Sequence, residues 1–150
     1  MGTLVTKKCM IYNGVYNDLK LFAQFVYIYE NKIKYFNRES DFTEFSEKAF
    51  YEFKKIRNKI KYSKKGEILK QKDSSKYTLF FTKSNTQVLD FCRHLRNAFC
   101  HALIEKQSKF IYIKDINRGG YSCCGFLEYK PIKQFMIELK ERYESDFKTK

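Results

Sequence analysis

The sequence predicts a mainly all-α protein: an up-and-down bundle of about four helices, with a β-hairpin inserted between the third and fourth helices. Three observations lead to this prediction. Apolar residues recur at helical spacing through most of the chain. A single proline and six glycines leave few breaks, and two β-prone runs flank a Gly-Gly pair. The length of 150 residues suits one domain, so we expect residues 1–150 to form a single unit.

Two amphipathic segments open the predicted bundle. Between residues 12 and 36, apolar side chains keep alternating spacings of three and four, which is typical of a helix with one buried face. Residues 42–60 repeat this pattern after a polar stretch in which Ser40 or Asp41 is a candidate N-cap. We expect these two helices to pack antiparallel. Residues 62–75 are rich in lysine and poor in apolar side chains, which indicates a mobile connection.

The second half of the chain holds the remaining predicted elements. Asn85 or Thr86 is a candidate cap for a third helix that ends near residue 105. Residues 110–115 and 121–127 flank a turn that contains Gly-Gly, which is typical of a hairpin. Pro131 suits the first turn of the last helix. The apolar residues at helical spacing in that helix are Ile132, Phe135, Leu139 and Tyr143.

The chain is strongly basic, with a net charge of +13 from 30 Lys and Arg against 17 Asp and Glu. Much of the excess lies between residues 54 and 72, where Glu67 is the one acidic residue. This pattern favours a polyanionic partner, and we expect RNA. A solvated surface of a lysine-rich protein is the alternative explanation. The candidate RNA-binding residues of the run are Lys54, Lys55, Arg57, Lys59, Lys61, Lys64 and Lys65.

Cysteine usage and hydropathy bound the location of the protein. The five cysteines are odd in number and follow no secretory signal. No stretch reaches the roughly 18 apolar residues of a membrane span. We therefore expect reduced thiols, a cytoplasmic protein and no membrane partner. The cysteines and histidines do not follow the spacing of paired zinc ligands, so we expect neither a metal nor another cofactor.

One arginine lies in the apolar stripe of the predicted third helix. At about 100° per residue, Arg96 falls inside the arc of apolar side chains. Burying a guanidinium is unfavourable unless it is paired or hydrogen-bonded. Arg96 is therefore predicted to have a structural partner, an interface or a ligand. An internal salt bridge to Asp90, to Glu105 or to an acid elsewhere is the structural explanation.

Arg96 and His101 carry the groups that metal-independent RNA cleavage needs. Histidine can take the proton from a ribose 2′-OH and donate one to the leaving oxygen. Arginine can stabilise the charge that develops on the phosphate. Because the two residues are roughly 140° apart on a straight helix, we expect a two-fold dimer to complete the site. Arg93, His94 and Asn97 lie on the polar stripe with His101, and Arg93 and His94 are candidates for contacting RNA.

The segment 95–101, Leu-Arg-Asn-Ala-Phe-Cys-His, resembles the arginine-to-histidine motif of the HEPN superfamily. The resemblance implies a small helical bundle and a metal-independent endoribonuclease that acts as a homodimer with a composite site. Members serve as toxins, antiphage effectors or RNA-processing enzymes, so an antitoxin or another regulatory protein is a further candidate partner. By this resemblance Arg96 and His101 are catalytic and Asn97 supports them. Ala102 and Leu103 stand where many members carry glycine and tyrosine.

Two other classes of function fit the same residues. A non-catalytic HEPN-like module would use the Arg-Asn-His surface to organise a dimer or to bind RNA or protein. A structural or inhibitory protein would use its aromatic surfaces to bind a partner and would have no affinity for RNA at low salt. Tyr112, Tyr121 or Tyr129 of the predicted hairpin are candidates for stacking on bases.

Overall fold

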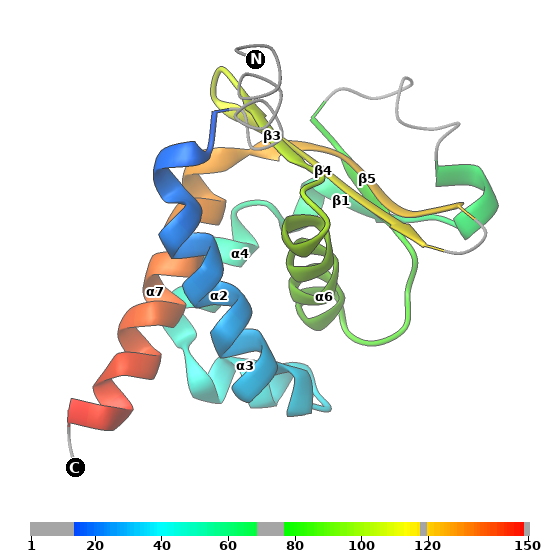
Figure 1. Cartoon of the computed structure of the whole chain (residues 1–150). Helices are drawn as coiled ribbons and strands as arrows, with labels where there is room; N and C mark the ends of the chain where they lie inside the picture. Colours follow the sequence, from blue (N-terminus) through cyan, green and yellow to red (C-terminus); the bar gives the residue numbers. More distant parts are fainter. Residues whose placement is uncertain (1–13, 69–76, 118–119, 149–150) are drawn as a thin grey trace.

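The computed structural model describes residues 14–68, 77–117 and 120–148, and it has an α+β fold (Figure 1). The described residues form five α-helices and one five-stranded mixed sheet. The prediction of a mainly all-α bundle with a single hairpin is therefore wrong. The expected hairpin exists, but it supplies only two of the five strands.

The helices follow the apolar periodicity, although within the described residues the first predicted helix ends at Asn31 and a separate 3₁₀ helix spans Ile33–Tyr35. The α-helices are α2 (Leu19–Asn31), α3 (Glu39–Phe45), α4 (Glu47–Lys54), α6 (Gln87–Cys100) and α7 (Tyr129–Lys148). The predicted second helix is divided because the backbone of Ser46 is extended, with φ −152° and ψ 100°. The Ala49 N–H donates to the Ser46 Oγ at 3.0 Å, which caps α4. The cap of α3 is Arg38 rather than Ser40 or Asp41, and its N–H donates to the Asp41 carboxylate.

The sheet combines the expected hairpin with three short strands. Its strands are β1 (Ile60–Tyr62), β2 (Leu79–Phe81), β3 (Ile104–Gln107), β4 (Phe110–Asn117) and β5 (Gly120–Glu128). They lie in the order β1-β2-β5-β4-β3, and only β1 and β2 are parallel. A period of two cannot be recognised in strands of three or four residues. For this reason the sequence predicts Ile60 and residues 104–105 as the ends of helices and predicts no strand at residues 79–81.

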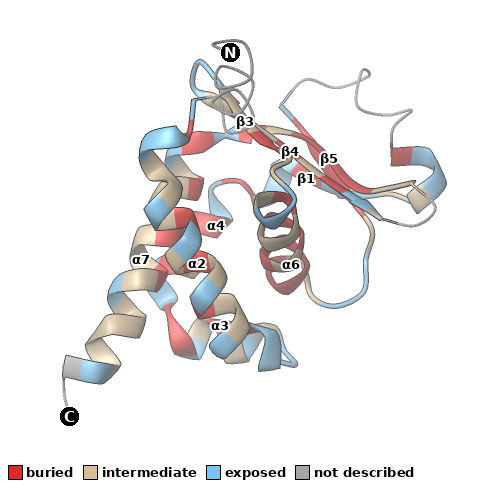
Figure 2. Cartoon of the chain, viewed as in Figure 1, coloured by how far each residue is buried: buried red, intermediate tan, exposed pale blue. Residues whose placement is uncertain are grey.

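Helix α6 lies against one face of the sheet, and α2, α3, α4 and α7 form a further layer beside it (Figure 1). The buried residues line the surfaces between these layers (Figure 2). Phe135 of α7 is at the centre of the helical layer, and its ring contacts four phenylalanines from four other helices. They are Phe25, Phe42, Phe53 and Phe91, with ring centroids 5.7–6.4 Å away. Each buried phenylalanine stabilises the fold by about 1.5–3 kcal/mol.

The central strand β5 passes very close to the start of β2. Gly125 has φ +152°, and a Cβ atom there would lie 2.1 Å from the carbonyl oxygen of Thr78. No side chain fits at that distance, so glycine permits this pairing. On the sheet face away from α6, Ile68, Phe80 and Cys124 form a second small apolar cluster.

Candidate functional site

A buried polar network lies where α6 meets β4. His94 and Asp115 are 0% and 1% exposed, and His94 Nδ1 lies 3.0 Å from Asp115 Oδ2. An ionised carboxylate can only accept hydrogen bonds, so Nδ1 carries the hydrogen and donates it. Asn97 Nδ2 donates to the same oxygen at 3.0 Å. His94 and Asn97 are three residues apart on α6, and that spacing places both side chains over Asp115.

The surroundings of Asp115 stabilise its charged form. Burial raises the pKa of Asp115, but the hydrogen bonds from His94 and Asn97 more than offset this effect and lower the pKa below its ordinary value. The Phe81 ring stacks on the imidazole of His94 with a centroid distance of 4.9 Å. The network is therefore a buried, ionised and hydrogen-bonded group with an aromatic ring stacked on its histidine.

Arg93 extends the network toward the surface. Its Nη2 lies 3.3 Å from His94 Nε2 and donates to Ser84 Oγ at 3.0 Å. The same guanidinium lies 3.5 Å from Asp90, which is 1% exposed. Asp90 in turn accepts hydrogen bonds from the backbone N–H groups of Ser84 and Asn85. These contacts connect the loop before α6 to the first turns of the helix, and Arg93 is the partly exposed member of the group.

Arg96 has an internal partner on another helix. Its Nε lies 2.7 Å from Glu30 Oε1 of α2, as an ion pair rather than an aligned hydrogen bond. Its Nη1 donates to Asn97 Oδ1 at 2.9 Å. The hydrogen bond from Lys34 and the positive charge of Arg96 lower the pKa of Glu30. Since the side chains of Arg96 and Glu30 are 31% and 34% exposed, this ion pair is partly solvated.

His101 lies outside this network. It is the C-cap residue of α6, it is exposed, and its backbone N–H donates to the carbonyl oxygen of Asn97. Ala102 then adopts a left-handed conformation with φ 58°, which turns the chain away from the helix axis. Within the described residues, hydrogen bonds link Arg96 through Asn97 and Asp115 to His94, and none joins Arg96 to His101.

An exposed basic surface surrounds the edge strand β1. Lys59, Lys61 and Lys64 are exposed around this strand, and Lys83 follows the neighbouring strand β2. The Lys83 Nζ lies 5.5 Å from the centre of the Tyr62 ring, and Tyr62 is 42% exposed. Across the part of the chain that the structure describes, none of these four lysines pairs with a carboxylate. We call these five residues the β1 surface.

Other cations of the basic run have structural contacts. Lys55 Nζ lies 3.0 Å from a carboxylate oxygen of Glu52. Arg57 forms an ion pair with Glu39, and its Nε donates to Gln87 Oε1 at 2.9 Å. Arg57 therefore connects α3 to the start of α6, and its charge is already partly neutralised.

The last two predicted members of the run lie at its margins. Lys54 is exposed at the end of α4, and its Nζ lies 5.6 Å from the centre of the Phe50 ring. Lys65 is partly buried in the short 3₁₀ helix Lys65–Glu67 that follows β1. Lys54 and Lys65 thus flank the β1 surface without belonging to it.

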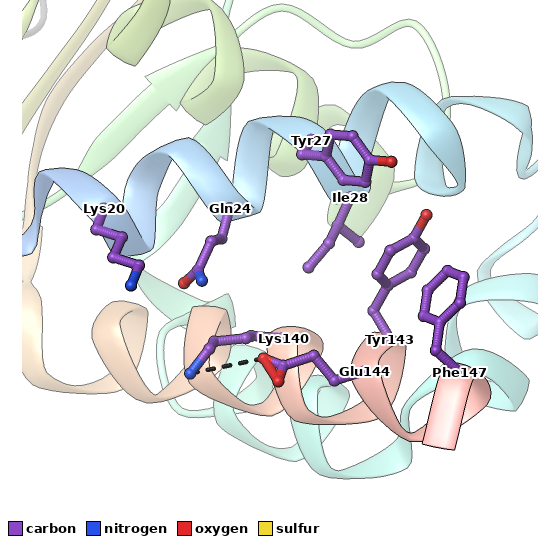
Figure 3. Close-up of a pocket in the computed structure, with 8 residues that line it drawn as sticks. All are labelled: Lys20, Gln24, Tyr27, Ile28, Lys140, Tyr143, Glu144 and Phe147. Atoms are coloured by element: carbon purple, nitrogen blue, oxygen red, sulfur yellow. Dashed lines mark ion pairs between the residues drawn. The ribbon is translucent and has the colours of Figure 1, made fainter. Parts of the chain in front are cut away.

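A groove of about 460 Å³ lies between α2 and α7 (Figure 3). Tyr27, Tyr143 and Phe147 gather at one end, with edge-to-face ring contacts at 5.9 and 5.1 Å. Lys140 and Glu144 form an ion pair on the α7 side at 3.6 Å. None of the residues predicted to act on RNA lines this groove.

The sequence indicates Asn97 and His94 as candidate functional residues, whereas Asp115 is not among the predicted site residues. Asp115 alternates with Ile111 and Ile113 along β4, so the strand period of two places it on the buried face. An acidic residue at a strand position that faces the core indicates that a buried hydrogen-bond partner must lie nearby. Glu30 had no comparable signal, because its pairing with Arg96 joins separate helices.

Three of the four cysteines in the described ranges are buried. Burial raises the pKa of Cys92 and of Cys123 above the ordinary value. Cys124 is also buried and lies 3.2 Å from the Tyr112 hydroxyl, while Cys100 is exposed. Among the described residues, no group of three His, Cys, Asp or Glu side chains is arranged to hold a metal ion.

Comparisons with known proteins find no relative: no family model matches the chain, and no curated protein or solved structure is significantly similar to it. In the ranges that the structure describes, no helix has the length and apolar character needed to cross a membrane.

Proposed function

We propose that this protein binds RNA through the β1 surface. The observation that supports the proposal is that Lys59, Lys61, Lys64 and Lys83 lie around one edge of the sheet without carboxylate partners among the described residues. Like charges at such a surface repel one another, and a polyanion removes that repulsion. Each phosphate that a lysine neutralises also releases counterions, which favours binding at low salt. In the part of the chain that the structure describes, Cys92, Cys100 and Cys123 form no disulfide; this supports a reducing compartment, and we propose the cytoplasm.

Charge-removal variants test this proposal. Replacing Lys59, Lys61, Lys64 and Lys83 by glutamine should weaken binding of a fluorescent RNA, measured by anisotropy over a range of salt concentrations. For single-stranded RNA, the slope of log K against log salt should fall by about 0.7 for each lost phosphate contact. The slope therefore reports how many of the four lysines contact phosphate.

A matched variant separates a local surface from net charge. Four exposed lysines elsewhere serve as the control when they are replaced by glutamine: Lys20, Lys32, Lys48 and Lys130. This control changes the net charge by the same amount but leaves the β1 surface intact. It should therefore retain most of the affinity for RNA. Equal losses in the two variants would mean that RNA is attracted by the overall charge, and the proposed surface would be rejected.

A metal-independent endoribonuclease formed by two copies of the chain is a second candidate. It is favoured by the position of His101, which is exposed at the end of α6 where another copy can approach. His101 would transfer protons, Arg96 would stabilise charge on the phosphate, and Asn97 would support them. Arg96 would have to exchange Glu30 for the phosphate. An antitoxin or regulatory protein would then act on this dimer.

RNA cleavage in EDTA tests the second candidate. Attack by the ribose 2′-OH leaves a 2′,3′-cyclic phosphate. The His101→Ala variant should no longer cleave RNA. Unchanged cleavage in this variant, or a 5′-phosphate product, rejects the mechanism. Because His101 is exposed, its replacement should leave the fold intact, and loss of activity would not reflect unfolding.

A further inference from the structure

The register of the sheet defines a face opposite α6. Paired residues on neighbouring strands share one face. Lys61 pairs with Phe80, which pairs with Cys124, which pairs with Lys114. These residues form one row from β1 to β4. Because Phe80 and Cys124 belong to the second apolar cluster, this row lies on the face away from α6.

Two stacked aromatic pairs occupy the next rows of the same face. Tyr112 pairs with Phe126, and their rings stack with a centroid distance of 4.5 Å. Phe110, two residues before Tyr112, stacks on Tyr77 at 4.0 Å. Tyr77 is 46% exposed, and the other three rings are partly exposed. Rings at the centre of the helical core, such as Phe53 and Phe135, are fully buried. By contrast, this face of the sheet presents aromatic surface to solvent.

The glutamates of this face lie at one end, where Lys109 Nζ also lies 5.7 Å from the centre of the Phe110 ring. Lys61 and Lys114 share the first row, and the Lys114 Nζ lies 5.4 Å from the centre of the Tyr112 ring. Glu105 and Glu128 lie in the rows of Tyr112 and Phe110. An anionic backbone is therefore attracted to the row of Lys61. Lys61 belongs to both this row and the β1 surface, and between Lys61 and Lys114 the row is buried against Ile68.

We infer that this face binds the unpaired bases of single-stranded RNA. The rings of Phe110, Tyr112 and Phe126 stack on bases, while Lys61 and Lys114 contact the phosphates. This inference rests on the proposed RNA binding and specifies its substrate class. Bases in a duplex are stacked on one another and do not offer their faces, whereas unpaired bases stack on aromatic side chains with little sequence preference.

Binding of two RNA probes tests the inference. The probes are a single strand of about 12 uridines, within the range of site sizes of small single-strand-binding domains, and a duplex of equal length. Phe126→Leu and Phe110→Leu should each weaken single-strand binding by about five-fold or more, with an unchanged salt slope. Duplex binding should be unaffected. Phe147→Leu, in the groove between α2 and α7, is the matched aromatic control and should bind like the unmodified protein.

Photocrosslinking of the unmodified protein gives a readout that does not depend on the folding of a variant. RNA that contains 4-thiouridine should crosslink to the peptides that carry Tyr112 and Phe126. Crosslinks confined to other peptides, or aromatic variants with full single-strand affinity, would overturn the inference. If only the lysine variant then weakened binding, the proposed RNA binding would stand. Absence of binding to both probes at low salt would refute the proposed function and this inference together.

Discussion

Replacing His94 by alanine tests the stability of the buried network. The variant removes the ring that stacks on Phe81 and the hydrogen bond from His94 to Asp115 Oδ2. Loss of a hydrogen bond to a buried charge costs about 1.5–3 kcal/mol, and a large buried side chain replaced by alanine leaves a destabilising cavity. Asn97 keeps its hydrogen bond to Asp115. We therefore expect a total loss of about 3–5 kcal/mol, against an overall stability of about 5–15 kcal/mol.

Urea unfolding followed by far-ultraviolet circular dichroism measures this loss. With a slope of about 1–3 kcal/mol per molar urea, a loss of about 3 kcal/mol lowers the midpoint by about 1–3 M. His101→Ala is the matched control because it removes the other histidine of the chain from an exposed position. The control should stay within about 0.5 kcal/mol of the unmodified protein. Equal midpoints for the two variants would refute the reasoning.

Three further predictions concern single residues. The folded state lowers the pKa of Asp115, so its charge stabilises the protein at neutral pH; this contribution should fade as the pH drops below about 4 toward the folded pKa. Urea midpoints measured against pH should lose that dependence in Asp115→Asn. Gly125→Ala should lower the free energy of unfolding by about 1–3 kcal/mol, because the added Cβ meets the Thr78 carbonyl. Thermal unfolding measures this loss. Gly66→Ala is the control, because a Cβ at Gly66 has no atom within 4 Å. Arg96→Ala should lower the free energy of unfolding by about 1 kcal/mol or less, since the ion pair between Arg96 and Glu30 is partly solvated. A loss that high salt leaves unchanged would contradict an electrostatic contribution.

The sequence predicted the elements in which a periodic pattern extends over many residues. Helix α7 and the hairpin β4–β5 lie close to the predicted ranges, and α6 starts as predicted but ends at Cys100 rather than near residue 105. The apolar spacing of residues 42–60 continues across Ser46, although the backbone there leaves the helix. Strands β1 and β2 have three residues each and gain their hydrogen bonds from partners distant in sequence. Local patterns do not encode such pairings, and this led to the incorrect fold class.

The polar network was predictable only in part. The position of Arg96 in an apolar stripe indicated that it needs a partner, and the sequence left the identity of that partner open. Glu30 became its neighbour through the packing of α2 on α6. His94 was predicted to face solvent or RNA, whereas the strand β4 buries it against Asp115. A helical wheel could not place His94 correctly because it did not include the sheet.

The contacts of Phe135 have a consequence for folding during synthesis. Phe25, Phe42, Phe53 and Phe91 all precede it in the chain and meet around its ring. The ribosome adds roughly 5–20 residues per second, so the 20 residues of α7 take about one to four seconds to make. During that interval these four rings lack their shared neighbour. The nascent chain therefore exposes an unfilled aromatic surface to chaperones until α7 emerges and docks.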